Sequence, residues 1–317
     1  MKTADRGRRI LLFGGTTEGR RMARILSEHG IHVTVCVATR TGADCLREIT
    51  GLRILTGRKD AAAMSELMRE GYDCCIDATH PYAVEAGRQI RKACAMSGLP
   101  CYRLLRRQLS DQELHRLIAD SIRQFCAEHD RYEDAELLSC AAEEMEQSMQ
   151  ASVCKSAEEA CALLEEAKAQ PGSSGGILLT CGAKEAACFS PLLRQNKNGV
   201  YIRTLPSKES IRICLDAGFP REQILTGWGP YSVEENVRTL EDHQIRYLVT
   251  KDGGWEGGYP QKLAGAALCG AKVIVIERPA EDGYEEGKLL RMLGIARYRS
   301  KVRVRRDEAV SITGSAS

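Results

Sequence analysis

The stretch ILLFGGTTEGRRMARIL, residues 10–26, constrains the fold of this chain more than any other. Its apolar start is followed at once by Gly14 and Gly15, and then by apolar residues that recur at helical spacing until Gly30. A strand that turns sharply through two glycines into a helix is typical of a β-α unit. The same alternation continues downstream, so the sequence predicts parallel sheets covered by helices on both faces.

Further strands are expected in two parts of the chain, separated by a region of different composition. The expected strands lie at 10–13, 31–39, 52–55, 72–77 and 100–105, and again within 175–182, 200–206, 223–229, 247–254 and 272–279. Residues 109–170 are rich in Ala, Glu, Leu and Gln and predict helices without a strand, and PGSSGG at 171–176 reads as a flexible joint.

These patterns predict an α/β protein with two Rossmann-like parallel-sheet domains and a helical insertion between them. We expect the first domain over 1–108, the helical insertion and linker over 109–170, and the second domain over 171–317. The repeated architecture predicts two sheets that face each other across a cleft, and the last residues, DEAVSITGSAS, predict a frayed tail.

Composition excludes several classes of partner. The chain has 317 residues with 45 basic and 43 acidic side chains, a net charge of +2, so no global field favours nucleic acid. No stretch approaches the ~20 apolar residues that span a bilayer, and MKTADRGRR lacks the apolar run of a signal peptide, which predicts a cytoplasmic protein.

The 14 cysteines include no Cys-x-x-Cys pair, and Cys74 and Cys75 lie in an apolar run. We therefore expect buried thiols of a reduced protein and no metal site.

The glycine turn at residues 14–19, GGTTEG, predicts a seat for an anion. Glycine lets the backbone approach a bound group closely, and the helix behind it directs its free N–H groups at the same point. Thr16 and Thr17 add hydroxyl donors, and the expected anion is the pyrophosphate of a dinucleotide. The motif departs from the usual G-x-G-x-x-G, so a glycine pair that only makes a tight turn is an equal alternative.

Arg40 follows the second strand, where an NAD site ordinarily carries an acidic residue for the ribose hydroxyls. An arginine between Thr39 and Thr41 suits a 2′-phosphate instead. The sequence thus favours NADPH over NADH, with a solvated surface arginine as the alternative.

The strand at 72–77 runs directly into Ala78-Thr79-His80-Pro81. Open parallel sheets bind ligands at the carboxyl ends of their strands, so we expect Thr79 and His80 to lie near a ligand. A histidine that only caps the next helix, with Pro81 in its first turn, is about as compatible with the spacing.

Seven stretches in order resemble the precorrin-6A reductase family, including its cobalt-precorrin-6A reductase branch in cobalamin biosynthesis. They are ILLFGGTTEGR (10–20), IDATHPYA (76–83), CYRLLR (101–106), LLTCGAKE (178–185), GWGPYSVEEN (227–236), LVTKDGGWEGGYPQK (248–262) and VIVIERP (273–279). The resemblance implies two Rossmann-like domains, NADPH between them, and hydride delivery to a tetrapyrrole, a precorrin or cobalt-precorrin, that carries many carboxylates.

Candidate site residues follow from the glycine loop, the strand ends and these stretches. Cofactor-binding candidates are Gly14, Gly15, Thr16, Thr17, Glu18, Arg40 and Thr79. Substrate-binding cations are Arg103, Lys184, Lys251 and Arg278, and candidates for the proton donor are His80, Tyr82 and Asp252, with water as an alternative.

The chain departs from the family pattern at Arg106-Arg107, where an arginine-proline pair is usual, and in the length of the helical stretch after it. That insertion could cover the substrate cleft, mediate self-association or decorate the surface. Two other functions are compatible with the first domain: an NADP-dependent reductase of another small substrate, and a redox-sensing protein that binds NADP(H) without turnover.

Overall fold

The computed structural model describes residues 7–129, 153–170, 174–195 and 199–295. The chain divides into two compact units. Unit 1 comprises the chain up to Leu105 together with the part that begins at Asp282, and unit 2 comprises Arg106–Glu281.

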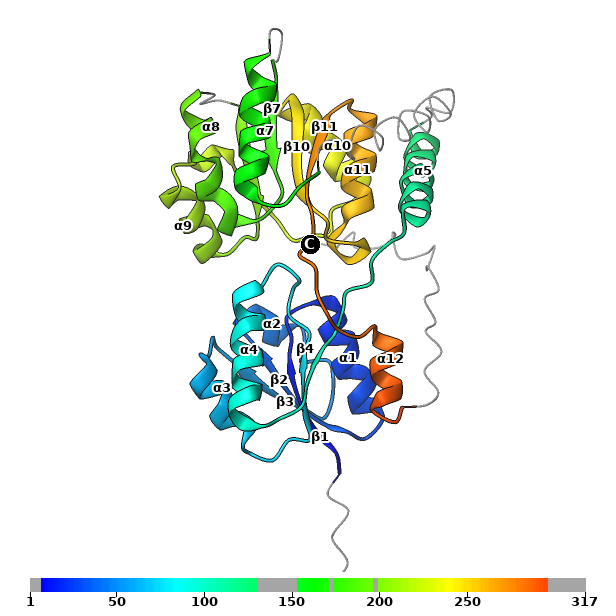
Figure 1. The fold of residues 1–317 in the computed structure, drawn as a ribbon. Coiled ribbons are helices and arrows are strands. Elements are labelled where there is room, and N and C mark those ends of the chain that lie inside the picture. Colours follow the sequence, from blue (N-terminus) through cyan, green and yellow to red (C-terminus); the bar gives the residue numbers. More distant parts are fainter. Residues whose placement is uncertain (1–6, 130–152, 171–173, 196–198, 296–317) are drawn as a thin grey trace, which may run out of the picture. The chain divides into compact units, whose positions relative to one another are not determined.

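The sheet of unit 1 has the order β3-β2-β1-β4-β5, and all of its strands are parallel (Figure 1). Its strands are β1 (Arg9–Phe13), β2 (His32–Val37), β3 (Leu52–Thr56), β4 (Cys74–Asp77) and β5 (Cys101–Arg103). The chain runs outward in one direction from β1 to β3 and in the other direction from β4 to β5. The strand order therefore reverses between β1 and β4, which is where doubly wound sheets bind ligands.

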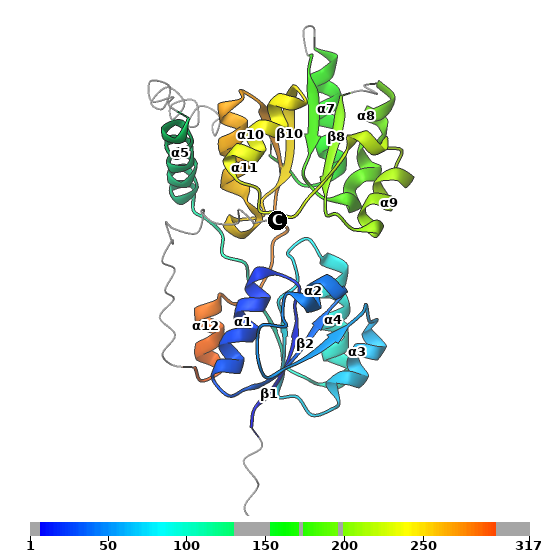
Figure 2. The same cartoon turned by 180° about the vertical axis from the view of Figure 1, so that it is seen from behind.

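Helices cover both faces of this sheet (Figures 1 and 2). The helices of unit 1 are α1 (Thr17–Glu28), α2 (Arg40–Asp44), α3 (Ala61–Met68), α4 (Val84–Ser97) and α12 (Glu286–Met292). Alternate residues of β1 serve opposite faces, as the strand period requires. Ile10 and Leu12 pack in the cluster that includes α1 and α12, whereas Leu11 and Phe13 pack with α3 and α4.

The described segment from Asp282 to Ile295 belongs to unit 1, whereas the sequence pattern predicts it in a second domain over 171–317. The Tyr284 N–H donates to Arg103 O at 2.8 Å and the Leu105 N–H donates to Tyr284 O at 2.9 Å, so the returning chain pairs beside β5. Leu289 and Leu290 of α12 are fully buried in the unit 1 core, which gives this helix its physical reason to return. The expected frayed tail at 307–317 lies outside the described residues.

The sheet of unit 2 is also parallel, with the order β6-β11-β10-β7-β8-β9. Its strands are β6 (Val153–Cys154), β7 (Gly176–Leu179), β8 (Val200–Thr204), β9 (Ile224–Thr226), β10 (Ile245–Lys251) and β11 (Lys272–Ile276). The order reverses between β7 and β10, so this sheet has a switch point of its own. The expectation of no strand within 109–170 is wrong for β6, which is too short to show an alternating pattern.

Two of the described helices of unit 2 lie within the predicted helical insertion over 109–170. The helices of this unit are α5 (Asp111–Glu128), α7 (Ala157–Ala169), α8 (Ser190–Gln195), α9 (Lys208–Asp216), α10 (Val233–Asp242) and α11 (Tyr259–Leu268), with short 3₁₀ turns η1 (Ala183–Phe189), η2 (Arg221–Gln223) and η3 (Trp255–Gly257). Ser110 and Glu113 form a capping box that starts α5. The apolar stripe of α5 packs through Ile118, Ile122 and Phe125 into a core with α10 and α11. The part of the insertion at 130–152 lies outside the described residues.

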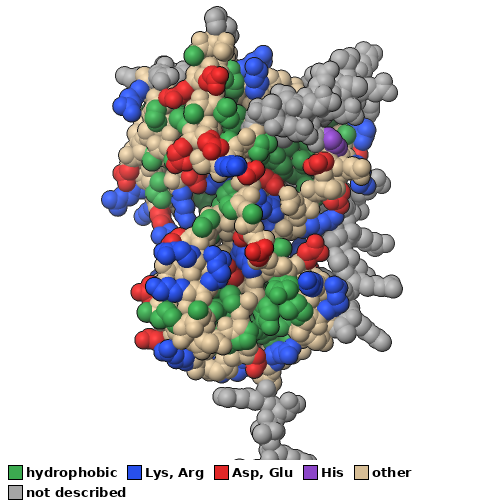
Figure 3. All heavy atoms as spheres, viewed as in Figure 1, with side chains coloured by type: hydrophobic (Ala, Val, Ile, Leu, Met, Phe, Trp, Pro, Cys, Tyr) green, Lys and Arg blue, Asp and Glu red, His purple; other side chains and the backbone are tan. Residues whose placement is uncertain are grey.

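Charges of both signs are interspersed on the face of the molecule drawn in Figure 3, in keeping with the small net charge of the chain. Within the described ranges, no helix combines the length and the apolar character that crossing a bilayer requires.

Candidate active site

The glycine turn lies at the switch point of unit 1, between β1 and α1. Gly15 has a φ of +115°, a conformation that favours glycine, and a Cβ placed on it would meet no described atom within 4 Å. A Cβ on Gly19 would lie 3.2 Å from Ala78 Cβ, so this glycine allows α1 to pack closely on the end of β4. The open space beside Gly15, facing the start of a 12-residue helix, fits a bound pyrophosphate.

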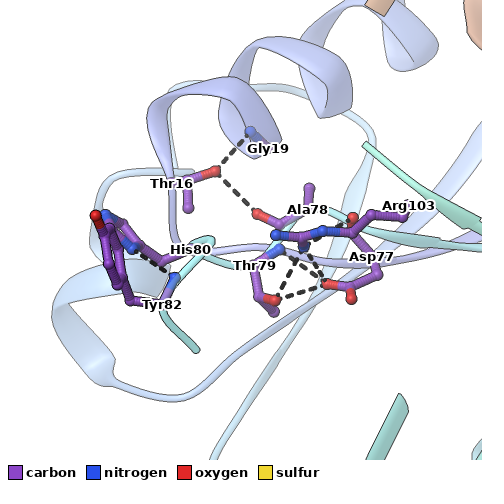
Figure 4. Close-up of polar contacts among 8 residues, drawn as sticks. All are labelled: Thr16, Gly19, Asp77, Ala78, Thr79, His80, Tyr82 and Arg103. Carbon is purple, nitrogen blue, oxygen red and sulfur yellow. Dashed lines mark hydrogen bonds and ion pairs between the residues drawn. The ribbon is translucent and has the colours of Figure 1, made fainter. Parts of the chain in front are cut away.

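Thr16 supports this turn from within (Figure 4). Its hydroxyl accepts from the Gly19 N–H at 3.0 Å and donates to Ala78 O at 2.9 Å. The side chain is therefore the N-cap of α1, and it ties the glycine turn to β4. Thr17 opens the helix, and Glu18 is buried in its first turn.

Arg40 is exposed at the first position of α2, close after the end of β2. The Thr39 hydroxyl caps this helix by accepting from the Gly42 N–H at 3.1 Å. Because β2 ends in Val37 and no carboxylate follows before α2, this strand end has a cation where an NAD site has an acid.

Asp77, Thr79 and Arg103 form a polar cluster at the ends of β4 and β5 (Figure 4). Asp77 Oδ1 accepts from the Thr79 backbone N–H at 3.0 Å and from its hydroxyl at 2.7 Å. Arg103 Nη1 lies 2.8 Å from the same oxygen, and the two side chains are only 10% and 2% exposed. The charge of Arg103 is thus balanced by Asp77, and the pair fixes the loop that carries Thr79.

His80 and Tyr82 lie beyond this cluster, just before α4. The Tyr82 N–H donates to His80 Nδ1 at 3.3 Å, and the two ring centroids are 5.6 Å apart. Accepting at Nδ1 places the proton of a neutral ring on Nε2. The N-cap residue of α4 is Ala83, and no side chain caps this helix, so His80 does not cap it. His80 instead holds the turn before α4, and it is exposed.

The switch point of unit 2 brings together the stretches LLTCGAKE and LVTKDGG. Lys251, which ends β10, forms an ion pair with Glu185 of η1, with Nζ 2.6 Å from Oε1. Lys184 beside it is exposed. The loop after β7 and the end of β10 are therefore joined where ligands of parallel sheets bind.

Asp252 and Arg278 form a second pair in unit 2. Asp252 Oδ1 accepts from the Gly254 N–H at 3.1 Å, and Arg278 Nη2 lies 3.4 Å from the same oxygen. Arg278 also donates to Arg106 O at 3.1 Å, while Arg106 Nη1 donates to Gly253 O at 2.7 Å. Arg106, at the departure from the family pattern, thus supports the loop after β10.

Three thiols from unit 1 converge although they are distant in sequence. The sulfur atoms of Cys75 on β4, Cys94 on α4 and Cys101 on β5 all lie within 4.8 Å of one another. Hydrogen bonds from Cys75 and Cys94 hold the pKa of the Cys101 thiol well below its usual range. Most of the described cysteines are buried and all of those recorded are free, but these three could hold a soft metal ion, so the reduced state and the absence of a metal site both stay predictions.

Sequence reasoning missed two groups in unit 2. Arg203 of β8 is buried and Lys262 of α11 is mostly buried. Trp228 and Trp255, which are 59% and 42% exposed, follow β9 and β10 at the carboxyl edge of the sheet. A charged residue inside the apolar strand VYIRTLP was the available signal for the first group, and tryptophans in glycine-rich loops were the signal for the second.

Known proteins resemble this chain over nearly all of its described length. The family model "Precorrin-6x reductase CbiJ/CobK" matches residues 9–293. A cobalt-precorrin-6A reductase of Methanothermobacter thermautotrophicus is 27% identical over 88% of this chain and 80% of its own length. The corresponding enzyme of Salmonella typhimurium is 26% identical over 85% of this chain and 87% of its own.

Two further matches have the metal-free name. A precorrin-6A reductase of Rhodobacter capsulatus is 26% identical over 86% of this chain and 88% of its own length. The solved structure of a CobK precorrin-6A reductase superposes with a TM-score of 0.60 at 21% identity, covering 91% of this chain and 96% of the other, which supports the two-sheet fold. The chain belongs to the precorrin-6x reductase family.

Proposed function

We propose that this protein catalyses the NADPH-dependent reduction of a ring double bond in precorrin-6A or cobalt-precorrin-6A, giving the corresponding 6B form in cobalamin biosynthesis. The observation that carries this proposal is the family match over residues 9–293. Relatives of similar identity have the cobalt-containing and the metal-free name, so both substrates enter the test.

The residues of unit 1 fit a dinucleotide. We assign the pyrophosphate to the backbone of Gly14 and Gly15 and the N-terminus of α1, and the 2′-phosphate to Arg40. The open space at Gly15 and the cation after β2 support this assignment. Thr16 and Thr79 act by shaping the loops, since both hydroxyls are hydrogen-bonded within the unit. Bound NADPH supplies a hydride from nicotinamide C4.

The chain's own task is to hold the macrocycle and to deliver a proton to the carbon beside the reduced one. Trp228 and Trp255 offer flat apolar surfaces suited to a tetrapyrrole ring. Of the four cations selected from the sequence, Lys184 is exposed and suited to meet a substrate carboxylate, whereas Arg103, Lys251 and Arg278 are ion-paired within their own units and hold loops in place.

For the proton we propose His80, because it is exposed just beyond the end of β4 and its Nδ1 accepts a hydrogen bond, which places the proton of the neutral ring on Nε2. Tyr82 and Asp252 remain the alternatives. Asp252 Oδ1 already accepts from a backbone N–H and faces Arg278, an arrangement suited to holding a loop. The cleft between the sheets, the cytoplasmic location and self-association through the insertion stay predictions.

The test is an anaerobic absorbance titration of purified protein with NADPH and then with precorrin-6A or cobalt-precorrin-6A. The proposal expects stoichiometric oxidation of NADPH by at least one of them. NADPH that binds but is oxidised by neither macrocycle would favour the binding protein without turnover, and oxidation by an unrelated small substrate would favour another reductase.

A further inference from the structure

Unit 2 contains a buried arginine that forms no ion pair with any described residue. Arg203, near the carboxyl end of β8, is 6% exposed. Its Nη1 donates to Asn236 Oδ1 at 2.8 Å, and its Cζ lies 4.2 Å from the centre of the Tyr231 ring. Its Nη2 is buried without a hydrogen-bond partner among the described residues. A guanidinium held only by an amide and an aromatic ring is costly to bury.

A second cation lies in the same interior. The Lys262 ammonium of α11 lies 3.4 Å from the hydroxyl of Thr250, which is fully buried on β10. Burial, and then the charge of Arg203, lower the pKa of Lys262 to about 8. Within the part of the chain that the structure describes, neither cation has an ion-pair partner, in contrast to Lys251 and Arg278. Each charge raises the cost of the other.

The neighbouring helices add to this cost. Asn236 is in the first turn of α10 and Lys262 is in the first turn of α11, so both cations lie near helix N-termini, where the backbone dipole is positive. Glu235 is the carboxylate whose charge acts on Arg203. It is exposed, however, and its Oε2 accepts from the Ser232 N–H at 2.7 Å in a capping box. An anion at this point would satisfy the orphan N–H groups of Arg203 and relieve the repulsion.

We propose that Arg203 and Lys262 bind an oxyanion: a carboxylate or phosphate group of a ligand. The site lies toward the carboxyl ends of β8 and β10, the edge at which parallel sheets bind ligands. Only the identity of that ligand rests on the proposed function, in which the macrocycle carries carboxylates and the cofactor carries phosphates.

The first test measures sulfate binding by calorimetry, because the charge of sulfate is constant over the pH range used. Lys262→Met and Arg203→Met should each weaken binding roughly 10- to 100-fold, as expected for loss of a charged hydrogen bond. The matched control is Lys272→Met, since Lys272 is exposed at the opposite, amino end of β11. It should bind sulfate as the wild type does.

The pH dependence has a defined sign. Lys262 is charged below its pKa of about 8, so sulfate affinity should fall as pH rises through that value, and Lys262→Met should lose this dependence. The other charged group facing it, Arg203, stays charged, and burial raises the pKa of nearby Cys181 to about 12, which keeps that thiol neutral. Bound sulfate should also raise the pKa of Lys262, measured by NMR of its side chain.

Two further titrations of the same variants, one with NADP⁺ and one with precorrin-6A as the probe, identify the natural ligand. Loss of precorrin affinity alone assigns a substrate carboxylate, and loss of NADP⁺ affinity alone assigns a cofactor phosphate. Sulfate binding still tests the site if precorrin-6A proves not to be the substrate. Thermal unfolding separates the roles: the two methionine variants should be at least as stable as the wild type. Unchanged affinity for all three probes, or destabilised variants with normal sulfate binding, would overturn the proposal.

Discussion

The buried pair between Asp77 and Arg103 gives a sharp prediction about how the carboxyl edge of the unit 1 sheet is held. Asp77→Asn keeps the size of the side chain and removes its charge, leaving a guanidinium that is 10% exposed without its counterion. Breaking a buried pair from one side costs about 3 to 5 kcal/mol. Arg103 keeps a donor contact to Thr79 Oγ1 at 3.1 Å, so we expect the lower end of that range, about 3 kcal/mol.

The assay is urea unfolding of the wild type, Asp77→Asn, Arg103→Met and the double variant, followed by a probe in unit 1. Because the first change already leaves the partner charge unpaired, the double variant should lose less stability than the sum of the two single losses. Asp44→Asn is the control: its pair with Arg47 has side chains 54% and 78% exposed, and should contribute below about 1 kcal/mol. Additive losses, or a loss at Asp77 no larger than at Asp44, would refute the buried-pair reasoning.

Four other predictions concern cofactor, substrate and thiol chemistry. Arg40→Ala should weaken NADPH binding roughly 10- to 150-fold and leave NADH binding nearly unchanged, measured by cofactor fluorescence; equal losses would remove the 2′-phosphate assignment. Gly15→Val, which forces a branched side chain to a φ of +115°, should abolish NADPH binding in a protein that still folds by circular dichroism; normal affinity would show that the glycine pair only makes a turn. Lys251→Ala should slow single-turnover oxidation of NADPH by the macrocycle about 10- to 100-fold, through loss of its pair with Glu185 or of a substrate contact; unchanged rates and affinities would remove it from the site. Cys101 should be alkylated by iodoacetamide faster than the other thiols at mildly acidic pH, because its pKa is lowered; equal modification of all thiols by mass spectrometry would contradict the shift.

The sequence predicted the strands of the two sheets better than it predicted which segments pack against each sheet. Apolar runs that end in glycine or polar residues mark the strands well, because a strand of a parallel sheet is buried on both faces. The apolar spacing of α12 shows that this helix packs against a sheet, but it does not show which of the two sheets. The return of α12 to the core of unit 1 therefore could not be predicted. Residues distant in sequence, such as Cys75 and Cys101, come together only through the strand order.

The candidate site divides in the same way. Motif positions located Gly15, Thr79 and Lys251 at strand ends, as the structure has them. Sequence position could not show that Arg103 and Lys251 meet carboxylates inside their own units, because an ion pair depends on which strands become neighbours. It also could not show that Arg203 meets no carboxylate among the described residues, since lone charges in strands usually find one.

The central claim, hydride transfer from NADPH to a precorrin ring carbon, is tested most directly with NADPH that carries deuterium at both positions of nicotinamide C4. After a single turnover with precorrin-6A or cobalt-precorrin-6A in ordinary water, mass spectrometry of the reduced macrocycle should show one deuterium from the cofactor and one hydrogen from solvent. A reduced product without cofactor deuterium, or an unreduced macrocycle recovered beside bound and intact NADPH, would contradict the account.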